Sequence, residues 1–217
     1  MPDSTNVKAM PPLSSHDRIL LSAKRLFALN GYENTSTVAI AREAGTSESQ
    51  LMKHFGSKRG LLAAILDRGW NGILGQIHTL PANSDPGHRL TYMVETFITE
   101  LENDPDLKVL MVLEAGRVRK DNRDVIVGPG FQQFAEALLV ALREMRDQGH
   151  IRPDMNLEAV RAAILGMTEG LLYDQVLAQR SEYRATYTSD DAKKVLGLVI
   201  STCLTEGSGQ PLKAANG

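Results

Sequence analysis

A short polar stretch, residues 44–62 (AGTSESQLMKHFGSKRGLL), gathers side chains that are suited to nucleic-acid recognition. It contains three glycines, two serines placed like helix caps, and the basic group Lys53, His54, Lys58 and Arg59. In the DNA major groove, glutamine pairs with adenine, lysine with guanine, and serine with either base. DNA is therefore the first candidate partner of this stretch.

The local pattern predicts two short helices joined by a tight turn. Ser36 is placed to cap the first helix, and Gly45 supplies the left-handed residue that ends it. Ser47 and Gln50 have the spacing of a capping box at the start of a second helix, which runs to about Phe55. In a helix-turn-helix of this kind, the second helix enters the major groove.

The second helix is expected to turn Leu51 and Phe55, which are four residues apart, toward a core. Thr37 and Lys58 lie at the starts of the flanking helices, where free backbone amides attract phosphate oxygens. Capped helix pairs also occur in proteins that never touch DNA, so the motif alone leaves both interpretations open. The outward side chains that are candidates to read base edges are Ser49, Gln50 and Lys53.

Charge is distributed unevenly along the chain, whose net charge is −2. Residues 14–60 hold seven Lys and Arg against four acidic residues, whereas the chain from residue 61 onward holds 16 against 21. The basic part, residues 14–60, is called the head, and the acidic part from residue 61 onward is called the body. This difference indicates that only the head binds a polyanion, although a difference of a few charges is weak support alone.

Amphipathic helical patterns dominate the sequence, and no alternating strand pattern of useful length is present. The pattern predicts an all-α fold with four short helices followed by about five longer ones. The first begins at a cap on Ser15 and stops at Asn30-Gly31. The others are expected at 36–44, 47–55, 58–76, 88–103, 106–120, 130–148, 157–180 and 190–205.

Composition and turn signals suggest a chain of four parts. No apolar run is long enough to span a bilayer, the N-terminal stretch lacks a secretory signal, and the single cysteine agrees with a reducing cytoplasm. The expected parts are a disordered leader (1–14), a helix-turn-helix DNA-binding domain (15–60), a helical ligand-binding and dimerisation domain (61–206) and a flexible tail (207–217).

The run GYENTSTVAIAREAGTSESQLMKHFGSKRGLL, residues 31–62, strongly resembles the DNA-binding domain of the TetR family of transcriptional repressors. The match spans about residues 16–66. The resemblance implies a three-helix unit linked by helix four to a larger helical domain that binds a small molecule and dimerises. It also places base reading on Ser49, Gln50 and Lys53, and phosphate contacts on Thr37, His54 and Lys58.

Two residues depart from the family pattern. Met52 stands where members usually carry a tyrosine whose hydroxyl meets the DNA backbone, and Thr46 replaces the more usual valine. Methionine cannot donate that hydrogen bond, but it can make an apolar contact with DNA. Met52 is therefore kept among the residues expected at the backbone.

A ligand pocket in the body is implied by the resemblance and not by the spacing of its residues. Glu114 and Arg117, beside an apolar run, either form a solvated pair or orient a ligand. Met and aromatic stripes are more often core than ligand contacts. The candidate pocket residues are Tyr92, Met93, Phe97, Met111, Glu114, Arg117, Glu169 and Tyr173.

A homodimer is expected because a two-fold symmetric operator needs two reader helices about 34–36 Å apart. Residues 157–180 and 190–205 carry broad apolar faces with Gly166, Gly170 and Gly197, which allow close helix contact. These two segments of each subunit are predicted to form a four-helix interface.

The expected function is a cytoplasmic, ligand-responsive repressor that releases a palindromic double-stranded operator when a small-molecule effector binds. The alternative is an architectural or chromosome-organising DNA-binding factor without an effector. An enzyme is not expected, because HExxH, P-loop and dinucleotide motifs are missing and the five histidines are scattered. No catalytic residue, cofactor or metal site is predicted, and no membrane partner.

Overall fold

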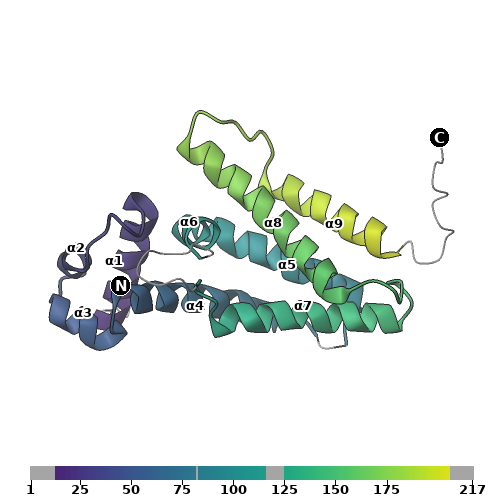
Figure 1. The fold of residues 1–217 in the computed structure, drawn as a ribbon, viewed down its shortest axis with the longest axis horizontal. Coiled ribbons are helices and arrows are strands. Elements are labelled where there is room, and N and C mark those ends of the chain that lie inside the picture. Colours follow the sequence, from purple (N-terminus) through teal and green to yellow (C-terminus); the bar gives the residue numbers. More distant parts are fainter. Residues whose placement is uncertain (1–12, 82, 116–124, 206–217) are drawn as a thin grey trace, which may run out of the picture. The chain divides into compact units, whose positions relative to one another are not determined.

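The computed structural model describes residues 13–81, 83–115 and 125–205, except for the side chains of residues 202–205. Within these residues the chain forms nine α-helices and no strand, which confirms the all-α prediction (Figure 1). The helices are α1 (Ser15–Asn30), α2 (Thr37–Glu43), α3 (Glu48–Phe55), α4 (Lys58–Ile77), α5 (Pro86–Asn103), α6 (Pro105–Leu113), α7 (Pro129–Asp147), α8 (Leu157–Arg180) and α9 (Ser189–Thr205).

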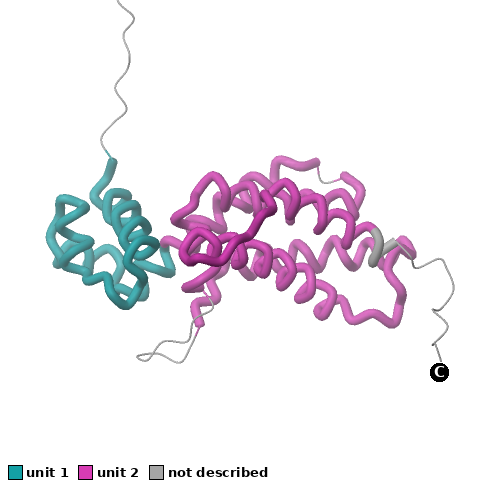
Figure 2. The backbone as a smooth tube through the Cα atoms, turned by 90° about the horizontal axis from the view of Figure 1, so that it is seen from above, with its two compact units in different colours: residues 1–64 teal, residues 65–217 magenta. Residues whose placement is uncertain are grey.

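The chain divides into two compact units, coloured separately in Figure 2. The first unit ends at Ala64 and the second begins at Ile65, so the division falls within α4. The first unit contains α1 to α3 and the first turns of α4. The second, which forms nearly all of the body, contains the rest of α4 and the helices α5 to α9; of these, α6 has only nine residues and is shorter than the predicted long helix.

Serine side chains cap the three short helices of the first unit. Ser36 and Ser47 cap α2 and α3 as expected, each accepting a backbone N–H from three residues further on. The cap of α1 is Ser14 and not Ser15, because the Ser14 hydroxyl accepts the Asp17 N–H at 3.1 Å. One residue of error is ordinary where two serines are adjacent.

The core of the first unit joins α1, α2 and α3. Ile19 and Phe27 of α1, Ile40 of α2 and Leu51 of α3 are each at most 1% exposed. Phe55 is only half-buried, and its ring lies 4.8 Å from the ring of His16 on α1. Leu51 therefore anchors α3 in the core as expected, whereas Phe55 packs at the margin.

The body helices begin at identifiable caps. Asp85, Asp104 and Asn156 cap α5, α6 and α8 through their side-chain oxygens. The prediction of a helix over 106–120 was wrong in length, because α6 ends at Leu113. There the amides of Glu114 and Ala115 both bond to the Leu110 carbonyl, at 2.9 and 3.0 Å, and close the last turn.

An aromatic cluster forms the centre of the body. Trp70 of α4 stacks on Phe97 of α5 with ring centroids 5.2 Å apart, and Phe134 of α7 packs against both rings. A Cβ at Gly130 would lie only 2.3 Å from the Trp70 Cβ, so this close approach of α7 to α4 requires glycine. Among the described residues, no helix is long and apolar enough to cross a membrane.

Candidate DNA-binding surface and ligand cavity

The turn before α3 is held by backbone geometry that favours glycine. Gly45 has φ of 62°, in the left-handed region, and the next amide, of Thr46, donates to the Ala41 carbonyl at 2.9 Å. The Ser47 hydroxyl then accepts the Gln50 N–H at 3.2 Å and starts α3. The path of the chain into α3 is therefore fixed by hydrogen bonds on both sides of the turn.

The three candidate base readers share the solvent-facing side of α3. Ser49, Gln50 and Lys53 are all exposed. The Gln50 side chain makes no hydrogen bond with any described residue, so only the Ser47 half of the expected capping box forms. The Gln50 amide consequently has its donors and acceptor available for a base edge.

Two of the candidate phosphate contacts already have partners within the first unit. The Thr37 hydroxyl donates to the carboxylate of Glu48, in the first turn of α3. The exposed His54 ring has its Nε2 3.2 Å from the Ser15 hydroxyl, which ties the end of α3 to the start of α1. Both groups lie close to α3, but each is hydrogen-bonded within the protein.

Lys58 begins α4 beside an aromatic ring. Its ammonium lies 4.3 Å from the centroid of the Tyr32 ring and donates to the Glu33 carbonyl at 3.3 Å. A cation over a ring face gains about 0.5–1 kcal/mol at an exposed site. Met52, at the position where the family usually has tyrosine, is 41% exposed and offers an apolar surface on α3.

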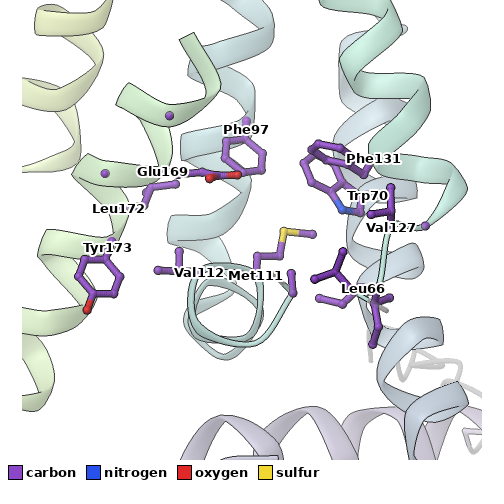
Figure 3. A pocket seen from close by; sticks show the side chains of 16 residues that line it. Leu66, Trp70, Phe97, Met111, Val112, Val127, Phe131, Glu169, Leu172 and Tyr173 are labelled. Carbon is purple, nitrogen blue, oxygen red and sulfur yellow. The ribbon is translucent and has the colours of Figure 1, made fainter. Parts of the chain in front are cut away.

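The body contains a cavity of about 420 Å³, shown in Figure 3. Its size is within the range of sites that hold small organic molecules. Five helices and the segment before α7 contribute to its wall: Leu66 and Trp70 (α4), Phe97 (α5), Met111 and Val112 (α6), Ala115, residues 125–128, Phe131 (α7), and Gly166, Glu169, Gly170, Leu172 and Tyr173 (α8).

Four of the eight candidate pocket residues line this cavity, namely Phe97, Met111, Glu169 and Tyr173. Met93 borders a second cavity of about 300 Å³ between α4, α5 and α7. Tyr92 places its hydroxyl 3.3 Å from that of Thr79, and Glu114 is buried at the end of α6; neither lines the larger cavity. Arg117 lies outside the described residues.

Much of the cavity wall was not among the candidates. Leu66 and Trp70 are four residues apart on one face of α4, and Phe131 follows Pro129 in the first turn of α7. The single tryptophan in a helix next to the DNA-binding unit was a signal that could have pointed to α4. Gly166 and Gly170, expected at a dimer contact, also line the cavity.

Glu169 is the only ionisable acid or base among the described lining residues, apart from the Tyr173 phenol. Its side chain reaches from α8 toward the middle of the cavity, on the side where Phe97 lies (Figure 3). Burial raises the pKa of this carboxyl above its ordinary value. Glu169 makes no hydrogen bond or ion pair with any described residue.

Close contacts join α4 to the cavity wall at three glycines. A Cβ at Gly69 would lie 2.6 and 2.7 Å from the two methyl carbons of Leu107 and 2.9 Å from the terminal methyl carbon of Met111. A Cβ at Gly128 would lie 2.1 Å from a carboxylate oxygen of Asp67. The Gly69 and Gly128 contacts are with the ends of side chains that can move, whereas the Gly130 contact with the Trp70 Cβ leaves the start of α7 no clearance from α4.

The last two helices carry exposed apolar side chains. Leu177 of α8 is 36% exposed, and Val195 and Leu198 of α9 are 51% and 66% exposed. A Cβ at Gly197 would meet nothing within 4 Å, so this part of α9 has open space around it. Within the described residues, no group of three or more His, Cys, Asp or Glu side chains is placed to hold a metal.

Comparison with known proteins identifies the first unit. Residues 19–65 match the family model described as bacterial regulatory proteins of the tetR family. The HTH-type transcriptional regulator UidR of Escherichia coli K12 is 26% identical over 175 residues, which cover 80% of this chain and 86% of UidR. The nucleoid occlusion factor SlmA of Photobacterium profundum is 23% identical over 169 residues, covering 77% and 86%.

The whole fold is also that of solved regulators. The transcriptional regulator FadR from Bacillus subtilis, solved in complex with stearoyl-CoA, superposes with a TM-score of 0.74 at 16% identity. The match covers 87% of this chain and 98% of FadR, so it includes the body as well as the first unit. Residues 19–65 therefore carry the tetR-family domain of bacterial regulatory proteins, and the chain as a whole has the fold of solved TetR-family regulators.

Proposed function

We propose that this protein is a cytoplasmic repressor that binds a palindromic operator as a homodimer and releases it when a small molecule enters the body. Residues 15–60 are the DNA-binding domain in this proposal, and residues 61–206 bind the effector and dimerise. The observation that carries the proposal is the combination in one chain of an exposed α3 after a glycine turn and a ligand-sized cavity beside α4.

The side chains on α3 support DNA recognition. Ser49, Gln50 and Lys53 are exposed together and are chemically able to read base edges, with Gln50 suited to adenine and Lys53 to guanine. A bidentate pair of this kind discriminates against the wrong base by about 1–3 kcal/mol. These three residues are the proposed base readers.

Contacts with the DNA backbone are assigned to the residues around α3. Thr37 and Lys58 lie at the N-terminal ends of α2 and α4, where free amides and a cation favour phosphate. His54 adds a ring nitrogen at the end of α3, and Met52 offers an apolar contact. Such contacts fix the register of α3 on the duplex without reading its sequence.

Dimerisation through α8 and α9 explains the exposed apolar side chains of these helices. Leu177, Val195 and Leu198 would be removed from water in a four-helix interface, and each buried side chain contributes about 1.5–3 kcal/mol. The open space beside Gly197 lets a second copy approach α9 closely.

The cavity is the proposed effector site. Its wall is mainly apolar and aromatic, so the body of the effector must be apolar too. FadR, which shares the fold, was solved with an acyl-CoA bound, which supports ligand binding by this type of body but does not identify the ligand here.

The glycine contacts of α4 provide a physical route from the cavity to the DNA-binding unit. Because Gly130 lies against the Trp70 Cβ, a ligand that moves the start of α7 should also move α4, and one that moves Met111 changes its contact with Gly69 on α4. The helix α4 continues without a break from Lys58 into the body. A ligand that binds one α4 position better than another shifts the population between an operator-binding and a released state.

The similarity to SlmA, a nucleoid occlusion factor, supports a second candidate function, that of a chromosome-organising factor. A chromosome-organising factor would bind many genomic sites and would need no effector. The ligand-sized cavity with a single carboxyl group favours the regulator, because such a factor has no use for it.

The deciding experiment is DNase footprinting of the purified protein on the DNA upstream of its own gene and of the divergent neighbour. A protected palindrome, with protection lost on addition of an effector, supports the proposal. Protection that no effector alters argues for a DNA-binding factor without a ligand switch. No protected site at any protein concentration would refute DNA regulation by this chain.

A further inference from the structure

The described wall of the cavity has one strongly ionisable group among apolar and aromatic side chains. Glu169 supplies that group, and Trp70, Phe97, Phe131 and Tyr173 supply the rings. None of the described lining residues is a lysine, arginine or histidine. The described wall therefore offers a negative charge and π-electron faces, with no positive charge to hold an anion.

The Glu169 carboxyl group has no partner among the residues that the structure describes. It makes no hydrogen bond or ion pair with any described residue, and burial alone accounts for the rise in its pKa. Glu169 is exposed in the free chain, so water still solvates part of its carboxyl group. A ligand that fills the cavity displaces this water, so it must bring a cation or a hydrogen-bond donor to Glu169 in exchange.

The aromatic rings favour a cation over a neutral donor. The faces of Trp, Tyr and Phe attract an ammonium group electrostatically, and this attraction is strongest where water is excluded. Phe97, which stacks on Trp70, lies beside the Glu169 side chain (Figure 3). Both features of the wall therefore select the same kind of ligand head.

We propose that the effector is a lipophilic organic cation, whose apolar or aromatic body fills the cavity and whose ammonium group meets Glu169. This inference rests on the proposed function, because it assumes that the cavity is the effector site. An anionic ligand would place like charges together at Glu169, and a plain hydrocarbon would leave the carboxyl group without a partner.

The single tryptophan, Trp70, lines the cavity and makes ligand binding directly measurable. Three probes with the same phenylbutyl body but different heads are titrated while indole fluorescence is recorded: 4-phenylbutylammonium, 4-phenylbutan-1-ol and 5-phenylpentanoate. Because a charge-assisted hydrogen bond is about twice as strong as a neutral one, we expect the ammonium probe to bind about tenfold more tightly than the alcohol. The carboxylate probe should bind most weakly, because Glu169 repels it.

Two variants on α8 separate the role of Glu169 from a general effect on the helix. E169Q removes the charge inside the cavity, whereas E158Q removes one in the first turn of α8, away from the cavity wall. We expect E169Q to lose the roughly tenfold preference for the ammonium probe and E158Q to retain it. Circular dichroism of both variants checks that the fold is intact.

The outcomes distinguish this inference from the proposed function. Equal binding of the three probes, tightest binding of the carboxylate, or no fluorescence response to any of them would overturn the assignment of a cationic ligand. Footprinting of the operator without ligand is a separate measurement, so its failure would refute the regulator and not the ligand class. Tighter ammonium binding that survives E169Q would also overturn the role of Glu169.

Discussion

The ammonium nitrogen of Lys108, on α6, donates a 2.6 Å hydrogen bond to the Oε1 atom of Gln175, on α8, and both residues are buried. The Gln175 amide donates in turn to the Ser189 hydroxyl, at 3.4 Å, where α9 begins. Burial lowers the pKa of Lys108, while the charge of Glu102 opposes that change. This chain of polar groups joins α6, which forms part of the cavity wall, to both proposed dimer helices.

Replacing Gln175 by leucine should destabilise the body, because the Lys108 ammonium is left buried without its acceptor. The loss of unfolding free energy should be about 2 kcal/mol, measured by urea denaturation. The double variant K108M/Q175L removes both polar groups. Its loss of unfolding free energy should be smaller than the sum of the losses in the single variants Lys108→Met and Gln175→Leu. Simple additivity of the two losses would show that the hydrogen bond contributes nothing specific.

Gly69→Ala should change the response to effector, because its new methyl group collides with the ends of Leu107 and Met111, and Met111 lines the cavity. These side chains are flexible, so the protein should still fold. The matched control is Gly72→Ala on the same helix, where a Cβ meets nothing within 4 Å and helix stability should rise by up to about 1 kcal/mol. The two variants are compared by the concentration of 4-phenylbutylammonium that gives half-maximal release of the operator. Identical values for the two variants would argue against the proposed route through α4.

Lys58→Ala should weaken binding to every DNA sequence and reduce the slope of log affinity against log salt by about one, since one phosphate contact is lost. Gln50→Ala should instead relax the preference at one base pair, by about 1–3 kcal/mol. Melting of the free proteins is the control, because Lys58 also contacts Tyr32 and Glu33. A uniform loss for Gln50→Ala would remove its assignment as a base reader.

Leu198→Arg should convert the dimer to a monomer, because it places a charge on the exposed apolar face of α9. Leu29→Arg is the control, since Leu29 on α1 is 69% exposed and Leu198 is 66% exposed. Light scattering coupled to size-exclusion chromatography reports the mass of each variant. A monomeric wild type at micromolar concentration, or a dimer that persists in Leu198→Arg, would exclude the proposed interface.

Glu169→Gln should not destabilise the protein at neutral pH and should raise its melting temperature slightly. The folded-state pKa of Glu169 is raised above the ordinary 4.5, so its ionised form is disfavoured in the folded protein. The loss of folding stability that the ionised Glu169 causes is fully present above the folded-state pKa. It disappears as the pH falls below 4.5, where the carboxyl group is protonated in both states. The gain from Glu169→Gln should therefore vanish in acid, which thermal melts between pH 4 and about pH 8 can check. A lower melting temperature at neutral pH would mean that the carboxylate has a stabilising partner.

Local features of this fold could be predicted from the sequence, because their causes are local. The caps on Ser36 and Ser47, the left-handed Gly45 and the bounds of α8 each depend on residues a few positions apart. The early end of α6 could not be predicted, since apolar periodicity continues beyond Leu113 while the backbone closes on Leu110.

The cavity was predictable only in part, because its wall is assembled from five helices distant in sequence. Phe97, Met111, Glu169 and Tyr173 were expected from their types, whereas Tyr92 and Met93 lie nearby on α5 but face other surroundings. The contributions of Trp70 and Phe131 depend on how α4 crosses α7 at Gly130, a contact that no sequence spacing reveals.

The hydrogen bond from Thr37 to Glu48 bears on how selective the proposed DNA contact is. In the free protein the Thr37 hydroxyl already serves a carboxylate, so a DNA phosphate must replace one anion with another. The Glu48 carboxylate also lies in the first turn of α3, where it repels any phosphate that approaches without a compensating gain. In the proposed complex, Glu48 would therefore compete with DNA phosphates for Thr37, which would weaken binding to arbitrary sequences and leave discrimination to the base contacts.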